Sequence, residues 1–218
     1  MATSQPDRGL KRIRHRPLRI CLTGGPCAGK SSVAADLLAH YPEQFLQSPE
    51  VASFCVPIGL RRDVPAEQQR FQGLILSVQR NLQTRLAALC ADLGRHLLLD
   101  RGTIDALAYL HPDATELADE SALAALRDWY DVVIHLRSMA VDFPDSYATD
   151  DSNHRNEEVE VAAALDRRLS QLWSPHACYY SINCSPDDIA GKFQAVREIV
   201  ERHTSAVTTH RSGNGTAA

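Results

Sequence analysis

Short apolar runs alternate along the chain with longer stretches in which apolar residues return every three or four positions. The short runs predict β-strands at residues 18–23, 44–48, 96–100, 131–136 and 178–183. The longer stretches predict helices at residues 32–40, 65–93, 103–110, 121–129, 157–173 and 186–202. Strands that alternate with helices form parallel sheets covered by helices on both faces. We therefore predict a three-layer α/β fold with a five-stranded parallel sheet.

The chain is long enough for one hydrophobic core, with 218 residues of which 44% are apolar, and it predicts one domain. We place this domain at residues 17–203. A flexible basic arm is expected at residues 1–16, and a disordered tail at residues 204–218. Residues 138–157 are polar and lack apolar periodicity, so they predict a short lid.

Composition argues against several classes of protein. The net charge of −4 gives no general reason to bind nucleic acid, and no apolar run approaches the ~18 residues of a membrane span. The six cysteines are scattered without a C-x-x-C pair, so they predict free thiols in a reducing cytoplasm rather than a disulfide framework or a zinc site. The basic arm is either a solvated segment or a contact for nucleic acid or lipid.

The segment LTGGPCAGKSS at residues 22–32 joins the first predicted strand to the first predicted helix. It matches G-x-x-x-x-G-K-[ST], the P-loop that cradles the phosphates of a nucleoside triphosphate. Glycines let successive backbone N–H groups point at an anion, and the start of a helix adds the positive end of its dipole. Lys30 would reach the β- and γ-phosphates, and the Ser31 hydroxyl would ligate Mg²⁺. The predicted nucleotide-binding residues are Gly24, Gly25, Pro26, Cys27, Ala28, Gly29, Lys30, Ser31 and Ser32.

Three charged residues stand where predicted strands end. Asp100 occupies the place of a Walker-B aspartate, which holds Mg²⁺ directly or through water; the alternative is an ordinary turn aspartate. Arg101 would hold a substrate phosphate or hydroxyl, or else form a surface salt bridge. Glu50 could take the proton from a hydroxyl that attacks the γ-phosphate, or it is a loop carboxylate.

Further polar residues are candidates for contacts with substrate or base. Gln72 and Gln79 lie two turns apart on one face of the long helix, so they either converge on one ligand or both face solvent. Asp105 is another candidate substrate contact. Asn183 ends the last predicted strand, where it either contacts adenine or belongs to a turn.

The predicted lid offers a candidate catalytic arginine. A mobile arginine that closes over the γ-phosphate is a common way to neutralise charge in phosphoryl transfer. Arg155 is our first choice, with Arg167 and Arg168 on the next helix as rivals; the alternative is a charged loop before a capped helix. Trp173 with His176 predicts a packing corner.

Together these motifs resemble the AAA-type P-loop domain found in the bifunctional nicotinamide riboside kinase regulator (NadR) and in the insect TRPL-translocation-defect protein. The resemblance runs over about residues 18–192, and its most specific parts are the P-loop and DRGTIDALAY at residues 100–109. It implies a fold similar to that of deoxynucleoside and thymidylate kinases. Related kinases often dimerise through long helices, so the resemblance also implies that residues 71–93 could form a homodimer contact.

In those kinases a carboxylate ends the second strand, an acid–Arg pair follows the third, and a lid contributes an arginine. Glu50, Asp100 with Arg101, and Arg155 stand at the matching places. Gln79 departs from the pattern, because deoxynucleoside kinases usually have an arginine at that position.

Two functions fit these residues. The first is a small-molecule kinase that transfers the γ-phosphoryl group of Mg·ATP to a hydroxyl or phosphate of a nucleoside-like or nucleotide metabolite. The second is a regulatory switch that hydrolyses ATP or GTP slowly and acts on a protein or phosphoinositide. An N-K-x-D motif for reading guanine is absent from the sequence, which argues against a Ras-like GTPase.

Overall fold

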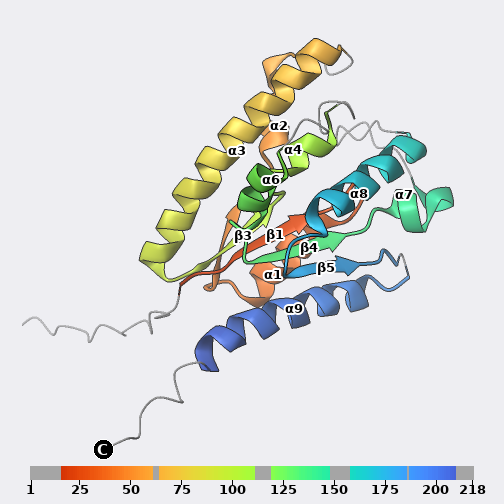
Figure 1. Cartoon of the computed structure of the whole chain (residues 1–218). Helices are drawn as coiled ribbons and strands as arrows, with labels where there is room; N and C mark the ends of the chain where they lie inside the picture. The colour runs from red at the N-terminus through yellow and green to blue at the C-terminus, as the bar shows by residue number, and fades with distance from the viewer. Residues whose placement is uncertain (1–15, 61–63, 111–118, 148–157, 186, 210–218) are drawn as a thin grey trace, which may run out of the picture.

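The computed structural model describes residues 16–60, 64–110, 119–147, 158–185 and 187–209 (Figure 1). Its five strands are β1 (Arg19–Thr23), β2 (Phe45–Ser48), β3 (His96–Asp100), β4 (Val132–Leu136) and β5 (Tyr179–Ile182). They form one sheet in the order β2-β3-β1-β4-β5, and every neighbouring pair is parallel. The predicted α/β fold with a five-stranded parallel sheet is therefore confirmed. Because β1 is central, the loop that follows it opens where the chain order of the strands reverses, which is where such sheets bind ligands.

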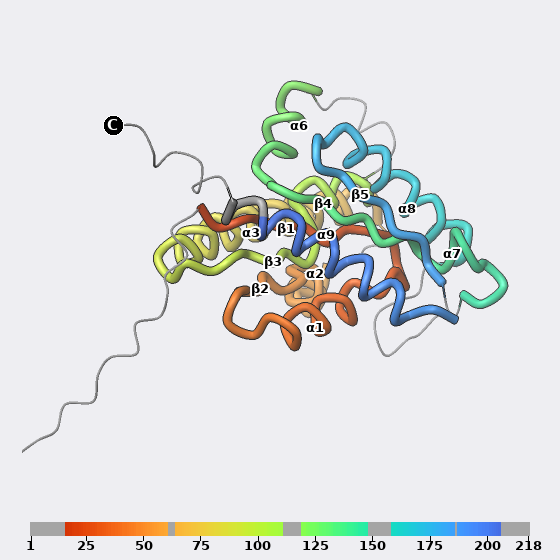
Figure 2. Tube along the Cα trace, turned by 90° about the horizontal axis from the view of Figure 1, so that it is seen from below, coloured from red at the N-terminus to blue at the C-terminus, as the bar shows by residue number. Residues whose placement is uncertain are grey.

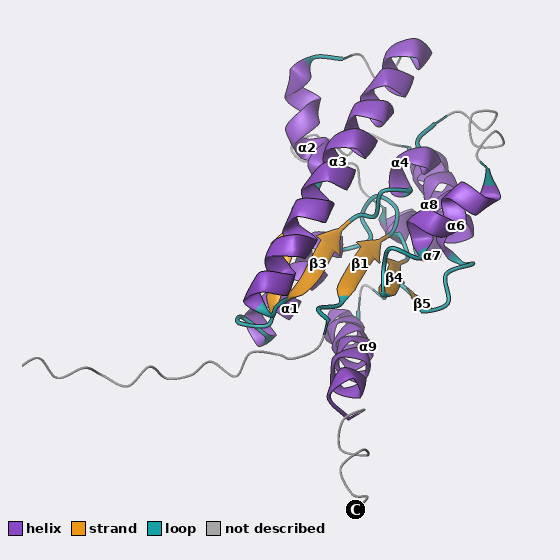
Figure 3. Ribbon diagram, turned by 60° about the vertical axis from the view of Figure 1, so that its left-hand side comes forward, coloured by secondary structure: helices purple, strands orange, loops and turns teal. Residues whose placement is uncertain are grey.

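Helices cover both faces of the sheet. Helices α1 (Lys30–His40) and α9 (Ile189–Thr209) lie side by side on one face (Figure 2). Helices α3 (Pro65–Leu93), α6 (Glu120–Arg127) and α8 (Val159–Trp173) cover the other face, as Figure 3 shows. Side chains of β1 alternate between the two layers: Ile20 and Leu22 pack with α1 and α9, whereas Cys21 packs with α3, α6 and α8. This alternation explains why the strands are apolar throughout.

Helix α3 begins and ends where the sequence predicts, but its buried face differs in part from the one that its apolar residues predict. Pro65 occupies its first turn, and Gly94 ends it in the left-handed conformation with φ 65°. Among its apolar residues, Phe71 and Ile75 are buried, whereas Val78, Leu89 and Leu93 are exposed. The buried face also includes three glutamines, Gln72, Gln79 and Gln83. The predicted homodimer contact along this helix stays a prediction.

Several short helices escaped the sequence analysis because they are too brief to show periodicity. They are α2 (Val51–Cys55), the 3₁₀ turn η1 (Val56–Ile58), α7 (Met139–Asp142) and the 3₁₀ turn η2 (Pro144–Ser146), while α4 (Asp105–Ala108) falls within a predicted helix. The Ser138 hydroxyl caps α7 by accepting a bond from the Ala140 N–H group. The first part of the predicted lid is therefore helical, and residues 148–157 lie outside the described residues.

The predicted limits of the domain need correction at its carboxyl end. Helix α9 continues to Thr209, into the segment expected to be a disordered tail, because after Gly191 in its first turn no glycine or proline follows before that residue. At the other end, Arg16 already pairs with Asp131. Nowhere in the described ranges is there a helix of sufficient length and hydropathy to cross a membrane.

Candidate functional site

The P-loop connects β1 to α1 in a conformation that demands glycine at two places. Gly24 has a φ of 139°, and a Cβ atom there would lie 2.0 Å from the carbonyl oxygen of Leu136. Gly29 has a φ of 77° and directly precedes the first turn of α1. The N–H groups of that first turn have no acceptor within the helix and are available to an anion. The loop therefore has the strand–loop–helix geometry on which the nucleotide-binding prediction depends.

Lys30 lies over this loop and donates to it. Its Nζ atom is 2.8 Å from the Gly24 carbonyl oxygen and 2.9 Å from that of Gly25. Burial and the nearby Arg101 guanidinium lower the pKa of Lys30 to about 8, against the opposing effect of Asp100 and Glu50. The ammonium group is thus still mostly protonated at neutral pH, and a phosphate could replace the two carbonyl acceptors.

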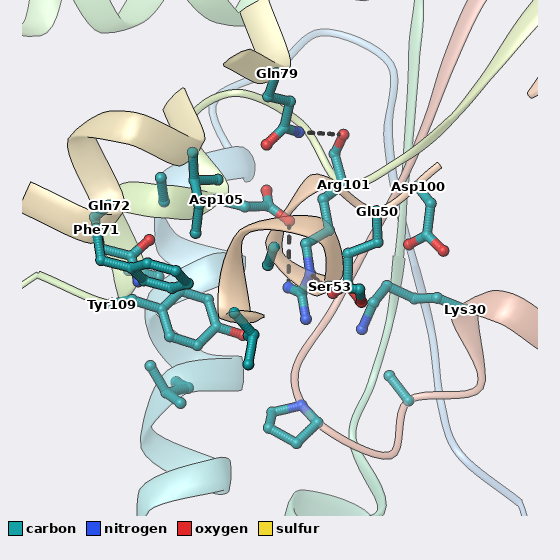
Figure 4. A pocket seen from close by; sticks show the side chains of 18 of the residues that line it. Lys30, Glu50, Ser53, Phe71, Gln72, Gln79, Asp100, Arg101, Asp105 and Tyr109 are labelled. Atoms are coloured by element: carbon teal, nitrogen blue, oxygen red, sulfur yellow. Dashed lines mark hydrogen bonds and ion pairs between the residues drawn. The ribbon is translucent and has the colours of Figure 1, made fainter. Parts of the chain in front are cut away.

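Asp100 ends β3 beside Lys30 (Figure 4). Within the described residues its Oδ1 atom is buried and accepts no hydrogen bond. Burial raises the pKa of Asp100, and the charges of Lys30 and Arg101 oppose this rise. An acceptor oxygen without a donor fits a magnesium ion or one of its water ligands, and Ser31, at the start of α1, would supply a hydroxyl ligand.

The described part of the chain contains no cluster of three or more His, Cys, Asp or Glu side chains that could hold a metal alone. A magnesium ion at Asp100 and Ser31 would therefore arrive with the phosphates of its nucleotide, as this ion usually does. Its charge would neutralise the negative charge that builds up on those phosphates.

Arg101 has an unusual backbone that α3 holds in place. Its φ is 75°, and its carbonyl oxygen accepts bonds from Gln79 Nε2 at 2.8 Å and Gln83 Nε2 at 2.9 Å. A left-handed conformation is costly for a residue with a side chain, so it requires such support. Gln79 is buried and has a structural contact, which excludes the alternative that it faces solvent.

The Arg101 side chain forms an ion pair inside the site rather than on the surface. Its Nε atom is 2.6 Å from Glu50 Oε1, and its NH1 atom is 3.7 Å from Asp105 Oδ2. Glu50 Oε2 also accepts from the Ser53 hydroxyl at 2.8 Å. Burial alone would raise the pKa of Glu50, but the Arg101 guanidinium outweighs it and, with Lys30 and Ser53, lowers this pKa to about 2. Glu50 is therefore a carboxylate at any physiological pH.

The carboxylate of Asp105 belongs to the scaffold, although it borders the cavity. Its Oδ1 accepts from the indole Nε1 of Trp173 at 2.6 Å, and its Oδ2 accepts from the Thr23 hydroxyl at 2.9 Å. Asp105 is 1% exposed. Asp105 thus links β1, α4 and α8 through these bonds. This is a different task from the substrate contact that the sequence predicts. Trp173 packs in the core as expected, and this bond to Asp105 could not be predicted.

A cavity of about 780 Å³ joins the P-loop to the space beneath α3. Four charged residues lie along it: Lys30, Glu50, Asp100 and Arg101. Figure 4 shows Arg101 between the other three and a second set of side chains. That second set, which we name the distal wall, consists of Phe71, Gln72 and Tyr109. Phe71 and Tyr109 were not predicted as site residues. Tyr109 ends the motif DRGTIDALAY that carries the family resemblance, which is its only signal, and Phe71 has the character of an ordinary apolar residue of the long helix.

The remaining predicted residues lie apart from this cavity or outside the described residues. Asn183 is exposed, and its Oδ1 accepts from Arg137 NH1 at 3.3 Å. Arg155 lies in the undescribed segment 148–157, so its predicted contribution stays a prediction. Among its rivals on α8, Arg168 borders the cavity and Arg167 is not among the residues that do.

The family model of the AAA domain matches residues 19–187 of the chain. The protein belongs to this AAA domain family. The matched span begins with β1 and extends past β5, so it includes the P-loop, the Glu50–Arg101 pair and the distal wall. A comparison with curated proteins finds no match for this AAA domain.

Solved structures of kinases share its fold. Deoxyadenosine kinase from M. mycoides with bound dATP is 10% identical with a TM-score of 0.54, over 84% of this chain and 100% of that one. Thymidylate kinase from Ehrlichia chaffeensis is 14% identical with a TM-score of 0.55, over 84% of this chain and 98% of that one. Thymidylate kinase from Candida albicans is 15% identical with a TM-score of 0.52, over 87% and 93%. The AAA domain thus has the fold of nucleoside and nucleotide kinases, as the sequence motifs led us to expect.

Proposed function

We propose that this AAA domain is an ATP-dependent kinase that phosphorylates a hydroxyl group of a small nucleoside-like metabolite. The observation that carries the proposal is the cavity of about 780 Å³ that continues from the P-loop past Glu50 and Arg101 to the distal wall. A protein that only hydrolyses a nucleotide needs room for water beside the γ-phosphate. This cavity extends from the P-loop to the side chains of Phe71, Gln72 and Tyr109, so it offers walls for a second small molecule besides the phosphates of ATP.

In this proposal the two sides of the cavity hold the two substrates. The P-loop and Lys30 bind the phosphates of ATP, with Ser31 and Asp100 next to its magnesium ion. The acceptor hydroxyl lies against Glu50 and Arg101. Its oxygen bonds to the γ-phosphorus, the bond from that phosphorus to the bridging oxygen of ADP breaks, and the hydroxyl proton passes to Glu50.

The low pKa of Glu50 decides how it assists. A carboxylate with a pKa of about 2 always accepts a hydrogen bond, but it is a weak base. Phosphoryl transfer passes through a loose transition state that needs positioning more than deprotonation. We infer that Glu50 mainly orients the hydroxyl and takes its proton late.

The charges around Arg101 favour a neutral acceptor group. Its guanidinium is already flanked by the carboxylates of Glu50 and Asp105, and Asp100 is near. A phosphate acceptor would bring further negative charge against these three carboxylates, whereas a hydroxyl can donate to Glu50 and accept from Arg101. The aromatic rings and the amide of the distal wall suit a planar, hydrogen-bonding group such as a nucleobase. The deoxyadenosine kinase and thymidylate kinases that share the fold have a nucleobase-bearing acceptor in common, whereas the choice of a hydroxyl over a phosphate rests on the charges around Arg101.

Two further assignments belong to the same proposal. Of the two arginines on α8, Arg168 borders the cavity. It could neutralise charge on the γ-phosphate, alone or with Arg155. The loop at Asn183 would border the adenine. The six cysteines are free, which fits a reducing compartment such as the cytoplasm.

The test is ADP formation from Mg·ATP with and without a panel of nucleosides, nucleoside monophosphates and other hydroxylated metabolites. We expect at least one neutral nucleoside-like compound to raise the rate well above that with water alone, with one phosphorylated product per ADP. Stimulation by monophosphates only would contradict the hydroxyl assignment. A water rate that no acceptor raises would favour the alternative of a regulatory ATP or GTP switch.

A further inference from the structure

The outer side of the P-loop is held by side chains from segments far along the chain. Asp166 of α8 accepts a bond at its Oδ1 atom from the Gly25 N–H group at 2.8 Å. The hydroxyl of Ser138, at the start of α7, donates to the Pro26 carbonyl oxygen. Lys192 Nζ of α9 donates to the Ala28 carbonyl oxygen at 2.7 Å. None of these three contacts uses a group that faces the phosphates in the proposed function.

Asp166 is the most constrained of the three. Its Oδ1 also accepts from the Ser138 N–H group at 3.1 Å and lies 3.2 Å from Nε2 of His135, a fully buried residue of β4. Asp166 itself is 3% exposed. A Cβ atom on Gly25 would lie 2.9 Å from the Asp166 Cβ, so the loop and α8 are in direct contact here.

Residues of α8 that precede and follow Asp166 in the sequence line the cavity. Leu165 and Arg168 are among the lining residues, and Trp173 at its end donates to Asp105 beside Arg101. A helix that is bonded from its buried face both to the P-loop and to the carboxylate beside Arg101 fixes the distance between them. Reaction rates depend steeply on such distances.

We propose that Asp166 is a positioning residue that fixes the P-loop against α8 by accepting the Gly25 and Ser138 N–H groups, so that the loop is preformed for phosphate binding. This inference rests on the proposed function only in assuming that the loop binds a nucleotide. Without the acceptor, the start of the loop would lose its fixed direction, and binding would have to reorder it. Preformed sites bind more tightly because this ordering cost is absent.

The test compares Asp166→Ala with Asp166→Asn in calorimetric titrations with Mg·ATP. Asparagine keeps an acceptor oxygen for both N–H groups, whereas alanine keeps none. We expect Asp166→Ala to raise the Kd for Mg·ATP about tenfold or more and Asp166→Asn to remain within about threefold of the original protein. Equal Kd values for Asp166→Ala and the original protein would overturn the inference, and so would equal losses in both variants.

Asp131→Ala is a matched control. Asp131 also accepts a backbone N–H bond, from Arg19 at 2.8 Å, but it precedes β4, so it lies at the amino-terminal ends of the strands, whereas the P-loop lies at their carboxyl ends. We expect this variant to bind Mg·ATP normally. If the original protein itself does not bind Mg·ATP, the proposed function fails first, which separates the two outcomes.

Amide hydrogen exchange tests the same bond in the original protein, even if Asp166→Ala fails to fold. With no nucleotide present, the Gly25 N–H group should exchange slowly because its acceptor is inside the protein. Fast exchange at Gly25, on a protein whose strand β1 is protected, would overturn the inference.

Discussion

The P-loop and the distal wall border the same cavity but are held in different ways. The loop is bonded along its length to Asp166, Ser138, Lys30 and Lys192, which come from four parts of the chain. The distal wall is formed by side chains of α3 and by Tyr109, which follows α4. Near it, Gln68 Oε1 is buried and has no hydrogen-bond partner among the described residues.

This difference matches what the two regions would bind under the proposed function. The phosphate chain of a nucleotide has one shape, so a rigid loop can be built for it in advance. A buried polar atom that lacks a partner, such as Gln68 Oε1, is costly and indicates that a ligand group completes the wall. The conformation of the P-loop is therefore fixed within the chain, whereas Asp100 Oδ1 beside it and Gln68 Oε1 near the distal wall would be completed by the metal ion and the acceptor.

The largest effect is expected on the donor side, from Lys30→Ala. This change removes the ammonium group that would contact the β- and γ-phosphates, so turnover should fall by at least ~10²–10³ and Mg·ATP binding should weaken. ADP formation and calorimetry would measure the two losses. Thermal unfolding of the variant should stay cooperative, and a folded variant with normal turnover would refute the P-loop assignment.

Glu50→Gln should have the second largest effect, and it separates chemistry from nucleotide binding. We expect kcat to fall by ~10², near the low end for a general base, because a carboxylate with a pKa of about 2 contributes mainly by orientation. The Kd for Mg·ATP should change little. A fall of less than threefold in kcat would leave Glu50 with only the structural task of pairing with Arg101.

The pH dependence follows from the same group. Its pKa in the folded protein lies below the usual value of 4.5, so Glu50 loses its proton before the pH reaches the neutral range. The kcat of the original protein should therefore show no acid limb from Glu50 between about pH 5 and 8. Such a limb in the original protein, absent from Glu50→Gln, would mean that this carboxylate is far more basic than its contact with Arg101 implies.

The same contrast explains what could be predicted from the sequence. The β-strands and the long helices follow from apolar periodicity, and the P-loop from glycine and lysine at fixed spacing, because these signals are local. The residues Glu50, Asp100 and Arg101 could be placed at one edge because parallel strands end together. Here the sequence was sufficient for the fold and for bringing these three charged residues together.

Pairing between distant residues could not be predicted. Asp105 and Gln79 have the character of substrate contacts in the sequence. In the structure Trp173 and Thr23 donate to the two carboxylate oxygens of Asp105, and the Arg101 carbonyl oxygen accepts from Gln79 Nε2. No local pattern indicates that Asp166 would meet Gly25 across 141 positions of chain. Short helices such as α2 and α7 fall below the length at which periodicity is visible.

On the acceptor side, Gln72→Ala should raise the KM for the acceptor found in the nucleoside screen by ~5–10-fold, the cost of one hydrogen bond. The KM for ATP should not change. Gln79→Ala is the matched control, because Gln79 bonds to the Arg101 backbone at 2.8 Å. It should lower the free energy of unfolding more than Gln72→Ala does. If Gln72→Ala leaves the acceptor KM unchanged, the distal wall is not the acceptor site.

The smallest effect is expected from Thr23→Val, which tests whether Asp105 belongs to the scaffold. Valine has nearly the shape of threonine, but it cannot donate the 2.9 Å bond to Asp105 Oδ2. Because Trp173 still donates to Oδ1, we expect a loss of about 1 kcal/mol in the free energy of unfolding, measured by urea denaturation. The KM of the acceptor should stay the same, since the carboxylate still points at the protein and not at the substrate. A marked rise of this KM with unchanged stability would instead make Asp105 part of the acceptor site and would narrow the contrast between the two sides of the cavity.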